Sequence, residues 1–358
     1  MQKVQKILVI NFGSTSSKFA YYENEDCKAK TSINHPVEEI KQFEAVFDQY
    51  EYRFNHILEF IVSNGIDCGT LDVIVSKGGN IRPVVGGVYL INEAVINDVK
   101  SGRFGRHPDD IGVLIASAMA EEFYAIPLIV DPPVTDEFES LARYSGLPDM
   151  PRISSFHTLN QRAVGRLYAK DIGRKYEDLN MIGVHLGGGI SVAAHKRGKM
   201  VDANNALYGD GPFSTNRTGT LPVGALVDAC YSGKYTHDEM RSRINGQGGM
   251  MAYIGENDVK TVETAALEGN KAYKECLDAM IYQVCKEIGA IATVLKGNID
   301  AIFLTGGMAH SKYITEYIKD KAGFLGEVVI YPGEYEMQAL GLRGYDASRS
   351  PDKVIVLE

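Results

Sequence analysis

The stretch ILVINFGSTSSK, residues 7–18, runs from a short apolar segment into a turn of glycine, small hydroxyl residues and one lysine. A second stretch, MIGVHLGGGIS at residues 181–191, has the same layout when the first glycines of the two turns are aligned. Each stretch continues into a second apolar segment, at 18–22 and 191–195. We interpret the two as copies of one strand-turn-strand unit, so the chain is expected to contain this unit twice.

Segments rich in Ile and Val alternate with helical patterns along the rest of the chain. The strand-like segments are 7–10, 72–75, 127–130, 181–186, 301–304 and 328–331. Apolar residues recur at helical spacing over 109–124, 158–176 and 270–295, and Thr158 stands where it could cap the second of these helices. The alternation predicts an α/β fold with layered strands and helices.

Composition narrows the class of protein. A chain of 358 residues with 45% apolar content can bury a large core and predicts two domains. The net charge of −9 is spread out, and no run of Lys and Arg is long enough to follow a nucleic-acid backbone. The five cysteines are scattered and suggest neither disulfides nor a zinc site. With no leader and no apolar membrane span in the sequence, we expect a soluble, cytoplasmic protein without nucleic-acid or membrane partners.

Three glycine-containing turns follow predicted strands. The first, Asn11 to Lys18, offers backbone N–H groups, hydroxyls and a cation to an anion, although it is not the loop-then-helix phosphate motif because a strand follows it. The second is HLGGGIS at 185–191, and the third is TGGMAHS at 305–311, which precedes a helix. Each alone is most often an ordinary turn. Together, at the carboxyl ends of strands, they predict a nucleotide site.

Phosphoryl transfer also needs carboxylates for Mg²⁺ and cations for the phosphates. Asp131 follows one predicted strand and Glu336 follows another, although either could be a plain loop or cap residue. Arg217 lies in GPFSTNRTGTLP and His157 lies in SSFHTLNQ. A single arginine in a loop is commonly solvated and a single histidine at a helix start is commonly structural, so these four remain candidates.

The ordered set of motifs resembles the butyrate kinase group of the acetate kinase family, within the superfamily of sugar kinases, the Hsp70 ATPase domain and actin. The resemblance covers essentially the whole chain. It is carried by INFGSTSSK, KGGNIRPVVGGVY, RHPDD, IVDPPVTDEF, SSFHTLNQRA, HLGGG, GPFSTNRTGTLP, LTGGMAHS and PGEYEMQAL. It implies a two-lobed actin-like ATPase (ribonuclease H-like) fold with duplicated βββαβαβα-type domains. One lobe would be 1–150 with a C-terminal helix at 337–358, the other would be 151–336, and ATP would lie between them.

The resemblance also implies roles for individual residues. Arg217, His157 and His185 would meet the γ-phosphoryl oxygens, and Asp131 and Glu336 would organise Mg²⁺. The residues implied near the phosphates are Asn11, Ser14, Ser16, Lys18, Gly187 and Gly188, and those implied near the rest of the nucleotide are Asp258, Lys260, Gly306 and Gly307.

Two positions depart from the acetate kinase pattern. Ile74 replaces an arginine that precedes the paired glycines 78 and 79, and Gly188 replaces an asparagine. Lys77 or Arg82 is therefore the candidate for binding the substrate carboxylate, and acetate is not expected to be the preferred acid. Phe156, Phe213 and Tyr208 could narrow an acyl pocket or could equally belong to the core.

The implied reaction is reversible transfer from ATP to butyrate, giving butanoyl phosphate and ADP. A carboxylate with a pKa of about 4 is already ionised at neutral pH, so no catalytic base is needed and Asp131 is interpreted as a metal organiser. Alternatives are a kinase for branched or other short-chain acids, a kinase with a hydroxyl acceptor, or a nucleotide-switched chaperone. The last is disfavoured because nothing like a peptide-binding domain follows. Family resemblance implies a homodimer or larger oligomer.

Overall fold

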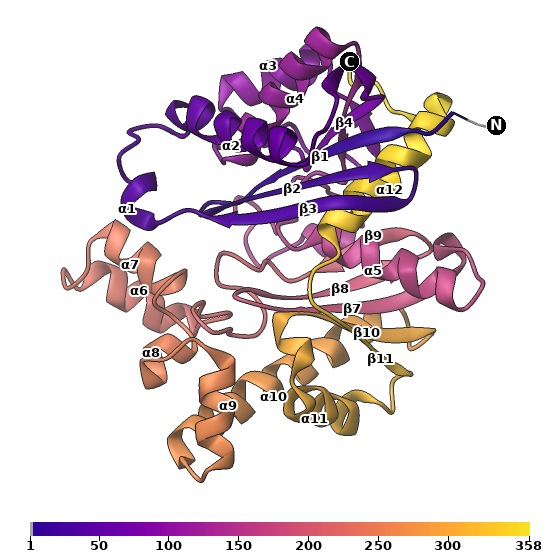
Figure 1. Ribbon diagram of the computed structural model, residues 1–358. Helices are drawn as coiled ribbons and strands as arrows, with labels where there is room; N and C mark the ends of the chain where they lie inside the picture. Colours follow the sequence, from indigo (N-terminus) through magenta and orange to yellow (C-terminus); the bar gives the residue numbers. More distant parts are fainter. Residues whose placement is uncertain (1–2) are drawn as a thin grey trace. The chain divides into compact units, whose positions relative to one another are not determined.

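The computed structural model describes residues 3–358 and divides them into two compact units (Figure 1). The first unit takes the described residues up to Asp136 and regains the chain at Tyr335–Glu358. The second unit is Glu137–Glu334. Each unit contains one β-sheet with helices packed against it, as the alternating pattern predicts.

The first unit is built on a six-stranded sheet with the strand order β3-β2-β1-β4-β6-β5. Strand β1 pairs antiparallel with β2 and parallel with β4. The strands are β1 (Lys6–Phe12), β2 (Ser16–Glu23), β3 (Asp26–Asn34), β4 (Val73–Ser76), β5 (Val88–Leu90) and β6 (Ile126–Val130). The helices are α1 (Val37–Ile40), α2 (Tyr50–Ser63), α3 (Glu93–Ser101), α4 (Asp109–Phe123) and α12 (Glu336–Arg349).

Helices α4 and α12 cover opposite faces of this sheet. Gly112 of α4 lies close to Phe12 and Ser76, whereas Gly344 of α12 lies close to Ile7 and Val75. Because successive side chains of a strand point to opposite faces, these contacts place one helix on each side of β1 and β4. Strand β1 is accordingly apolar on both faces and is buried from its second residue onward.

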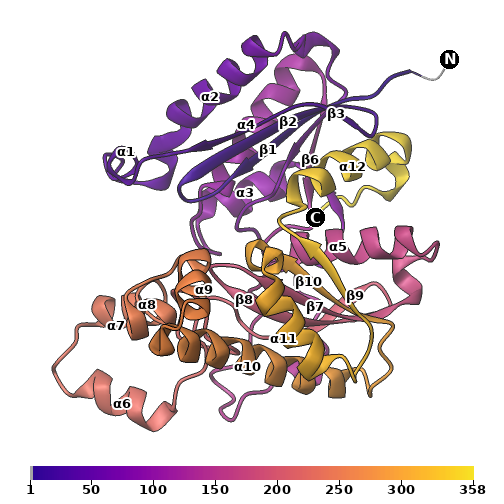
Figure 2. The same ribbon diagram turned by 60° about the horizontal axis from the view of Figure 1, so that its bottom comes forward.

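The second unit has a five-stranded sheet with the order β11-β10-β7-β8-β9. The strands are β7 (Asn180–Leu186), β8 (Ile190–Lys196), β9 (Lys199–Ala203), β10 (Ala301–Gly306) and β11 (Val328–Pro332). The helices are α5 (Thr158–Asp171), α6 (Val223–Tyr231), α7 (His237–Ile244), α8 (Met250–Ile254), α9 (Val259–Leu267), α10 (Lys271–Val294) and α11 (Lys312–Ala322). Figure 2 shows α10 beside α11, and the apolar face of α10 joins the core of the unit, as its helical spacing predicts.

The predicted internal repeat is confirmed. In each unit a hairpin is followed by a third antiparallel strand, and the first strand of the hairpin pairs in parallel with a later strand. Asn11 and His185 occupy equivalent positions, two residues before the first glycine of their turns. The turns differ by one residue, because four residues join Phe12 to Ser17 while three join Leu186 to Ile190.

Helix boundaries differ from the sequence prediction at three ends. Thr158 is the first residue of α5 and not its cap, since His157 takes the N-cap position without a capping side chain. Helix α5 ends at Asp171, where Gly173 turns the chain with φ of 67°. The C-terminal helix starts at Glu336 and ends at Arg349, because Pro351 disfavours a helical conformation for Ser350. No helix within residues 3–358 combines the length and apolarity that crossing a bilayer requires.

Candidate active site

A buried arginine binds carbonyl groups of the turn between β1 and β2. The Gly13 N–H donates to the Ser16 carbonyl at 2.8 Å, which closes the turn. Arg53 of α2 donates to the Ser14 carbonyl at 3.2 Å and to the Ser16 carbonyl at 3.1 Å. Burial lowers the pKa of Arg53 to about 10, so the guanidinium stays charged at neutral pH behind the turn. Sequence reasoning missed this residue.

Glu336 contacts polar side chains at the carboxyl end of β1. Its Oε2 accepts from Asn11 Nδ2 at 3.0 Å and lies 3.3 Å from Lys77 Nζ. Lys18 is the register partner of Asn11, so both side chains project from the same face of the sheet. Burial alone would raise the pKa of Glu336, but Lys77, the Asn11 amide and Lys18 together lower it below its usual value. The carboxyl group is therefore ionised at neutral pH.

A second carboxylate lies beside Lys77. Asp109 Oδ2 is 4.0 Å from Lys77 Nζ and 3.1 Å from His107 Nδ1, and His107 Nε2 lies 3.3 Å from Ser14 Oγ. Asp109 is 2% exposed, and its Oδ1 has no hydrogen-bond partner among residues 3–358. The RHPDD motif thus brings His107 and Asp109 to the first turn, although sequence reasoning gave them no role.

Asp131 follows β6 directly, as predicted, in a left-handed backbone conformation with φ of 41°. It is buried, and its N–H donates to the Gly87 carbonyl at 2.8 Å. The glycines at 78 and 79 allow the segment after β6 and the first turn of α4 to approach. A Cβ at Gly78 would lie 2.8 Å from Pro132, and a Cβ at Gly79 would lie 2.5 Å from Asp110, which accepts from the Asn80 N–H at 2.7 Å.

Arg82 does not join this cluster. Its guanidinium pairs with Asp98 through Nε at 2.7 Å and Nη2 at 3.0 Å, and Nη1 donates to the Glu358 carbonyl at 2.8 Å. Of the two residues predicted to bind the substrate carboxylate, Lys77 therefore lies beside Glu336 and Asp109, while Arg82 fastens the end of the chain.

The carboxylates of the first unit suit Mg²⁺ only when a phosphate supplies further ligands. No group of three or more His, Cys, Asp or Glu side chains within residues 3–358 is placed to hold a metal ion alone. Kinase Mg²⁺ sites commonly use one or two carboxylates, with phosphate oxygens and water completing the octahedron. Ionised Glu336 and the unpaired Oδ1 of Asp109 meet that requirement.

In the second unit, two histidines stack beside the triple-glycine turn. The His157 and His185 rings are 3.7 Å apart between centroids, with an angle of 8° between their planes. Two imidazolium ions at that separation would repel by about 4 kcal/mol at an effective dielectric constant near 20. A Cβ on Gly187 would lie 3.0 Å from His185 Nε2, so this edge of the ring faces the turn.

Arg217 reaches the same turn. Its Nε donates to Asn245 Oδ1 at 3.1 Å and its Nη1 donates to the Ala206 carbonyl at 2.7 Å. A side chain at Gly189 would overlap the Arg217 guanidinium, so the third glycine leaves room for it. The Ser214 hydroxyl donates to the Gly188 carbonyl at 2.6 Å and fastens the GPFSTNR loop onto the turn. Burial lowers the pKa of Arg217.

Asp258, Lys260 and Gly307, three of the predicted nucleotide residues, line one cavity of about 860 Å³ in the second unit, a size typical of small-molecule sites. Gly306 ends β10 next to it, with φ of 89° and no room for a side chain against Leu186. Asp258 also caps α9, which is the plain structural role for this residue. The lining is Gly187, Gly188, Thr215, Asn257, Asp258, Val259, Lys260, Glu263, Thr264, Leu267, Gly307, Met308, His310, Ser311 and Lys312.

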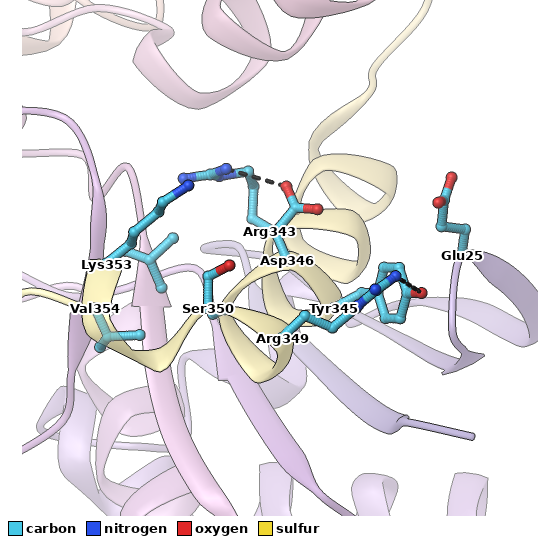
Figure 3. Close-up of a pocket in the computed structure, with 10 residues that line it drawn as sticks. Glu25, Arg343, Tyr345, Asp346, Arg349, Ser350, Lys353 and Val354 are labelled. Carbon is cyan, nitrogen blue, oxygen red and sulfur yellow. Dashed lines mark hydrogen bonds and ion pairs between the residues drawn. The ribbon is translucent and has the colours of Figure 1, made fainter. Parts of the chain in front are cut away.

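A second hollow, of about 460 Å³, lies in the first unit between α12, the segment after it and neighbouring strands (Figure 3). Arg343 pairs there with Asp346 at 3.1 Å, and Arg349 donates to Tyr345 at 3.0 Å. None of the predicted site residues lines it. Its arginines bind residues of their own helix, so we give it no part in phosphoryl transfer.

The three aromatic candidates for an acyl pocket have different surroundings. Phe213 belongs to the core of the second unit, and its ring lies 6.0 Å from that of Tyr253. Phe156 stacks on Phe138, while Tyr208 is half exposed beneath the Arg241 guanidinium. Phe213 therefore has a structural role. The contacts of Phe156 and Tyr208 do not place these two rings around one cavity.

Comparison with known proteins agrees with this geometry. The sequence model of the acetokinase family matches residues 151–340. The chain is 47% identical to butyrate kinase 2 of Clostridium acetobutylicum over 335 residues, which covers 94% of each chain. It is 48% identical to a probable butyrate kinase of Bacteroides thetaiotaomicron over 345 residues, covering 96% of this chain and 97% of the relative.

Solved structures show the same fold. An acetate kinase from Porphyromonas gingivalis superposes with a TM-score of 0.73 at 19% identity, covering 94% of this chain and 98% of that one. A propionate kinase from Francisella tularensis gives a TM-score of 0.71 at 18% identity, covering 96% and 99%. The expected actin-like ATPase fold is thereby confirmed. Because the family model matches residues 151–340, and the chain is 47% and 48% identical to these relatives over nearly its whole length, this chain belongs to the acetokinase family.

Proposed function

We propose that this protein transfers the γ-phosphoryl group of ATP to the carboxylate of butyrate or a similar short-chain acid, forming an acyl phosphate and ADP in a reversible reaction. Relatives named butyrate kinase, 44% and 47% identical over nearly the whole chain, support butyrate as the acid. One observation carries the proposal. The glycine turn that lines the 860 Å³ cavity also holds Arg217 and the stacked histidines, so a nucleotide in that cavity would present its phosphates to them.

The nucleotide is proposed to lie along α9 and the start of α11, with its phosphates at Gly187 and Gly188. Both residues line the cavity, and nothing stands within 4 Å of where a Gly188 side chain would be. Glycine therefore leaves the backbone N–H groups of the turn open to close approach by phosphate oxygens.

Charge is the main obstacle to this reaction. The acid has a pKa near that of Glu, about 4.3, and is already a nucleophile at neutral pH, so no general base is required. The carboxylate must approach a phosphoryl group that is also negative. Arg217 of the second unit and Lys18 of the first are proposed to offset this repulsion and to stabilise charge in the transition state.

The acid carboxylate is proposed to bind near Lys77, because Arg82 already forms a bidentate pair with Asp98. Mg²⁺, when bound, would neutralise phosphate charge and favour an in-line arrangement of the reacting atoms. Glu336 and Asp131 are proposed to hold it, with Asp109 as an additional carboxylate beside Lys77.

A panel of acceptors tests the proposal. The purified protein is incubated with ATP, Mg²⁺, hydroxylamine and one acceptor at a time, and acyl hydroxamate and ADP are both measured. Butyrate, isobutyrate and valerate are expected to give equal amounts of hydroxamate and ADP, with less product from acetate. Since one methylene in a pocket is worth only about 1 kcal/mol, the three longer acids should overlap. ADP formation with sugars and none with acids would overturn the proposal.

A further inference from the structure

Two chains of buried hydrogen bonds end on the Nδ1 atoms of the stacked histidines. Both pass through α5, where the neighbouring residues Asn160 and Gln161 each serve one ring. Both side chains are essentially fully buried, so each of their donors and acceptors requires a partner. The directions of these bonds can therefore be worked out one by one.

The first chain of hydrogen bonds fixes the tautomer of His185. The Thr305 hydroxyl donates its only hydrogen to the Gly333 carbonyl at 3.1 Å, so its oxygen must accept from the Asn160 amide at 3.2 Å. That requirement orients the Asn160 NH₂ group, which also lies 3.0 Å from His185 Nδ1. His185 Nδ1 therefore accepts a hydrogen bond, and the ring proton is on Nε2.

The second chain starts from a backbone carbonyl. Gln161 Nε2 donates to the Ser191 carbonyl at 3.2 Å, so Gln161 Oε1 faces His195 Nε2 at 3.0 Å and must accept from it. His195 Nδ1 then accepts from the Tyr176 hydroxyl at 2.8 Å. Burial lowers the pKa of His195 to about 3, which agrees with a neutral ring held at both nitrogens.

The amide group of Gln161 also determines the tautomer of His157. Gln161 Nε2 also donates to Ser191 Oγ at 2.8 Å, and Ser191 is fully buried. Among residues 3–358, the acceptor hydrogen-bonded to the Ser191 hydroxyl is His157 Nδ1 at 2.9 Å. If His157 Nδ1 carried a proton, two donors would meet at one buried oxygen and the hydroxyl hydrogen would lose this acceptor. The ring proton of His157 is therefore also on Nε2.

We propose that these two hydrogen-bond chains hold both stacked histidines as neutral tautomers with the proton on Nε2, so that the pair donates hydrogen bonds to a phosphoryl group and does not act as a pair of cations. Asn160, Gln161 and Ser191 are then positioning residues. The part played by the phosphoryl group rests on the proposed function, whereas the tautomers are a property of the free protein. The role of His157 as a cation, expected from its sequence, is replaced by that of a neutral donor.

The tautomers can be measured without any activity assay. The full chain is labelled with ¹⁵N-histidine, and long-range ¹H–¹⁵N spectra are recorded at pH 7, with each ring assigned by replacing one histidine at a time with Gln. Both His157 and His185 should show an unprotonated Nδ1 and a protonated Nε2, and His195 should give the same pattern as an internal reference. A protonated Nδ1 on either stacked ring would overturn the proposal.

Asn160→Asp links the tautomer to catalysis. A carboxylate in place of the amide accepts where the amide donated, so the proton of the neutral His185 ring should move from Nε2 to Nδ1, seen in the same spectra as a protonated Nδ1 and an unprotonated Nε2. If the donor role holds, kcat should fall about a hundredfold with a smaller change in the KM for ATP. Asn298→Asp makes the same exchange at an exposed position and is expected to retain both the wild-type spectrum and the wild-type kcat.

Each outcome of the Asn160→Asp experiment has one reading. A His185 ring with a protonated Nδ1 and an unprotonated Nε2, together with an unchanged kcat, would overturn the donor role. An unchanged spectrum in a folded variant would overturn the part assigned to Asn160. If the variant does not fold, the wild-type spectra still decide the tautomers, and a wild type without kinase activity would count against the proposed function alone.

Discussion

Arg217 can reach the triple-glycine turn only because residue 189 has no side chain. The space that a Cβ of residue 189 would need is taken by the guanidinium, which is held there by the Ala206 carbonyl and by Asn245. Glycine is therefore needed at position 189 to leave room for the guanidinium, which is a different reason from backbone flexibility. Arg217 and Gly189 form one functional unit, although they are 28 positions apart in the sequence.

Gly189→Ala is predicted to displace the Arg217 guanidinium and to lower kcat at least tenfold, approaching the loss of about a hundredfold or more expected for Arg217→Ala. The KM for ATP should change less, because the cavity lining is untouched. Gly224→Ala, at a position with no atom within 4 Å of the added Cβ, is the matched control and should keep wild-type kinetics. Wild-type kcat in Gly189→Ala would contradict the assigned role of Arg217.

His195 makes the second unit sensitive to acid. Its folded pKa of about 3 lies below the usual 6.5, so the unfolded chain binds a proton more readily as the pH falls below 6.5. The free energy of unfolding should therefore decrease by about 2 kcal/mol between pH 7 and pH 5 on account of this residue. His195→Gln removes that contribution, so urea unfolding of the variant should lose about 2 kcal/mol less than the wild type over the same interval. Equal losses would show that His195 is not held neutral.

Among the helices and strands, α2 helps to fix the turn between β1 and β2, in addition to the residues of the turn itself. Arg53 of α2 binds the Ser14 and Ser16 carbonyls, the Ser17 hydroxyl and Gln49, and its guanidinium lies 5.0 Å from the centroid of the Phe12 ring. Only a planar group with several donors can serve these acceptors at once. The shape of the turn is thereby linked to the packing of α2.

Arg53→Met is predicted to destabilise the protein by about 2 to 4 kcal/mol, because several buried acceptors lose their donor. The loosened turn should also raise the KM for ATP. Arg53→Lys keeps the charge but not the planar group, so it should recover only part of the loss. Urea unfolding and steady-state kinetics check both effects. A Met variant with wild-type stability and wild-type KM would show that Arg53 does not stabilise the turn.

The strands and the duplicated hairpin could be predicted from sequence because apolar runs and glycine turns are local signals. The three helix ends that differed depend on weaker signals, such as a histidine in the cap position of α5. Lys77 was identified by its motif, but its approach to Glu336 joins segments far apart in the chain. Arg53, His107 and Asp109 were missed for the same reason, since Ser14 and His107 are 93 residues apart. Such contacts arise from tertiary packing and leave no local pattern.

At the scale of the whole molecule, one strand-turn-strand unit has been used for two kinds of chemistry. At equivalent positions of the first strands, Asn11 binds the carboxylate of Glu336 and His185 stacks on His157. The first unit thus brings lysines and carboxylates together, while the second brings together histidines, an arginine and the cavity of about 860 Å³.

In the proposed reaction, an oxygen of the carboxylate attacks the γ-phosphorus of ATP. Butyrate labelled with ¹⁸O in both carboxylate oxygens is incubated with the protein, ATP, Mg²⁺ and hydroxylamine, and the released phosphate is analysed by mass spectrometry. Attack on phosphorus leaves one butyrate oxygen as the bridge of the acyl phosphate, and hydroxylamine then attacks the acyl carbon and expels that oxygen with the phosphate. We predict one ¹⁸O in each phosphate formed, whereas unlabelled phosphate accompanied by ADP release would contradict the account.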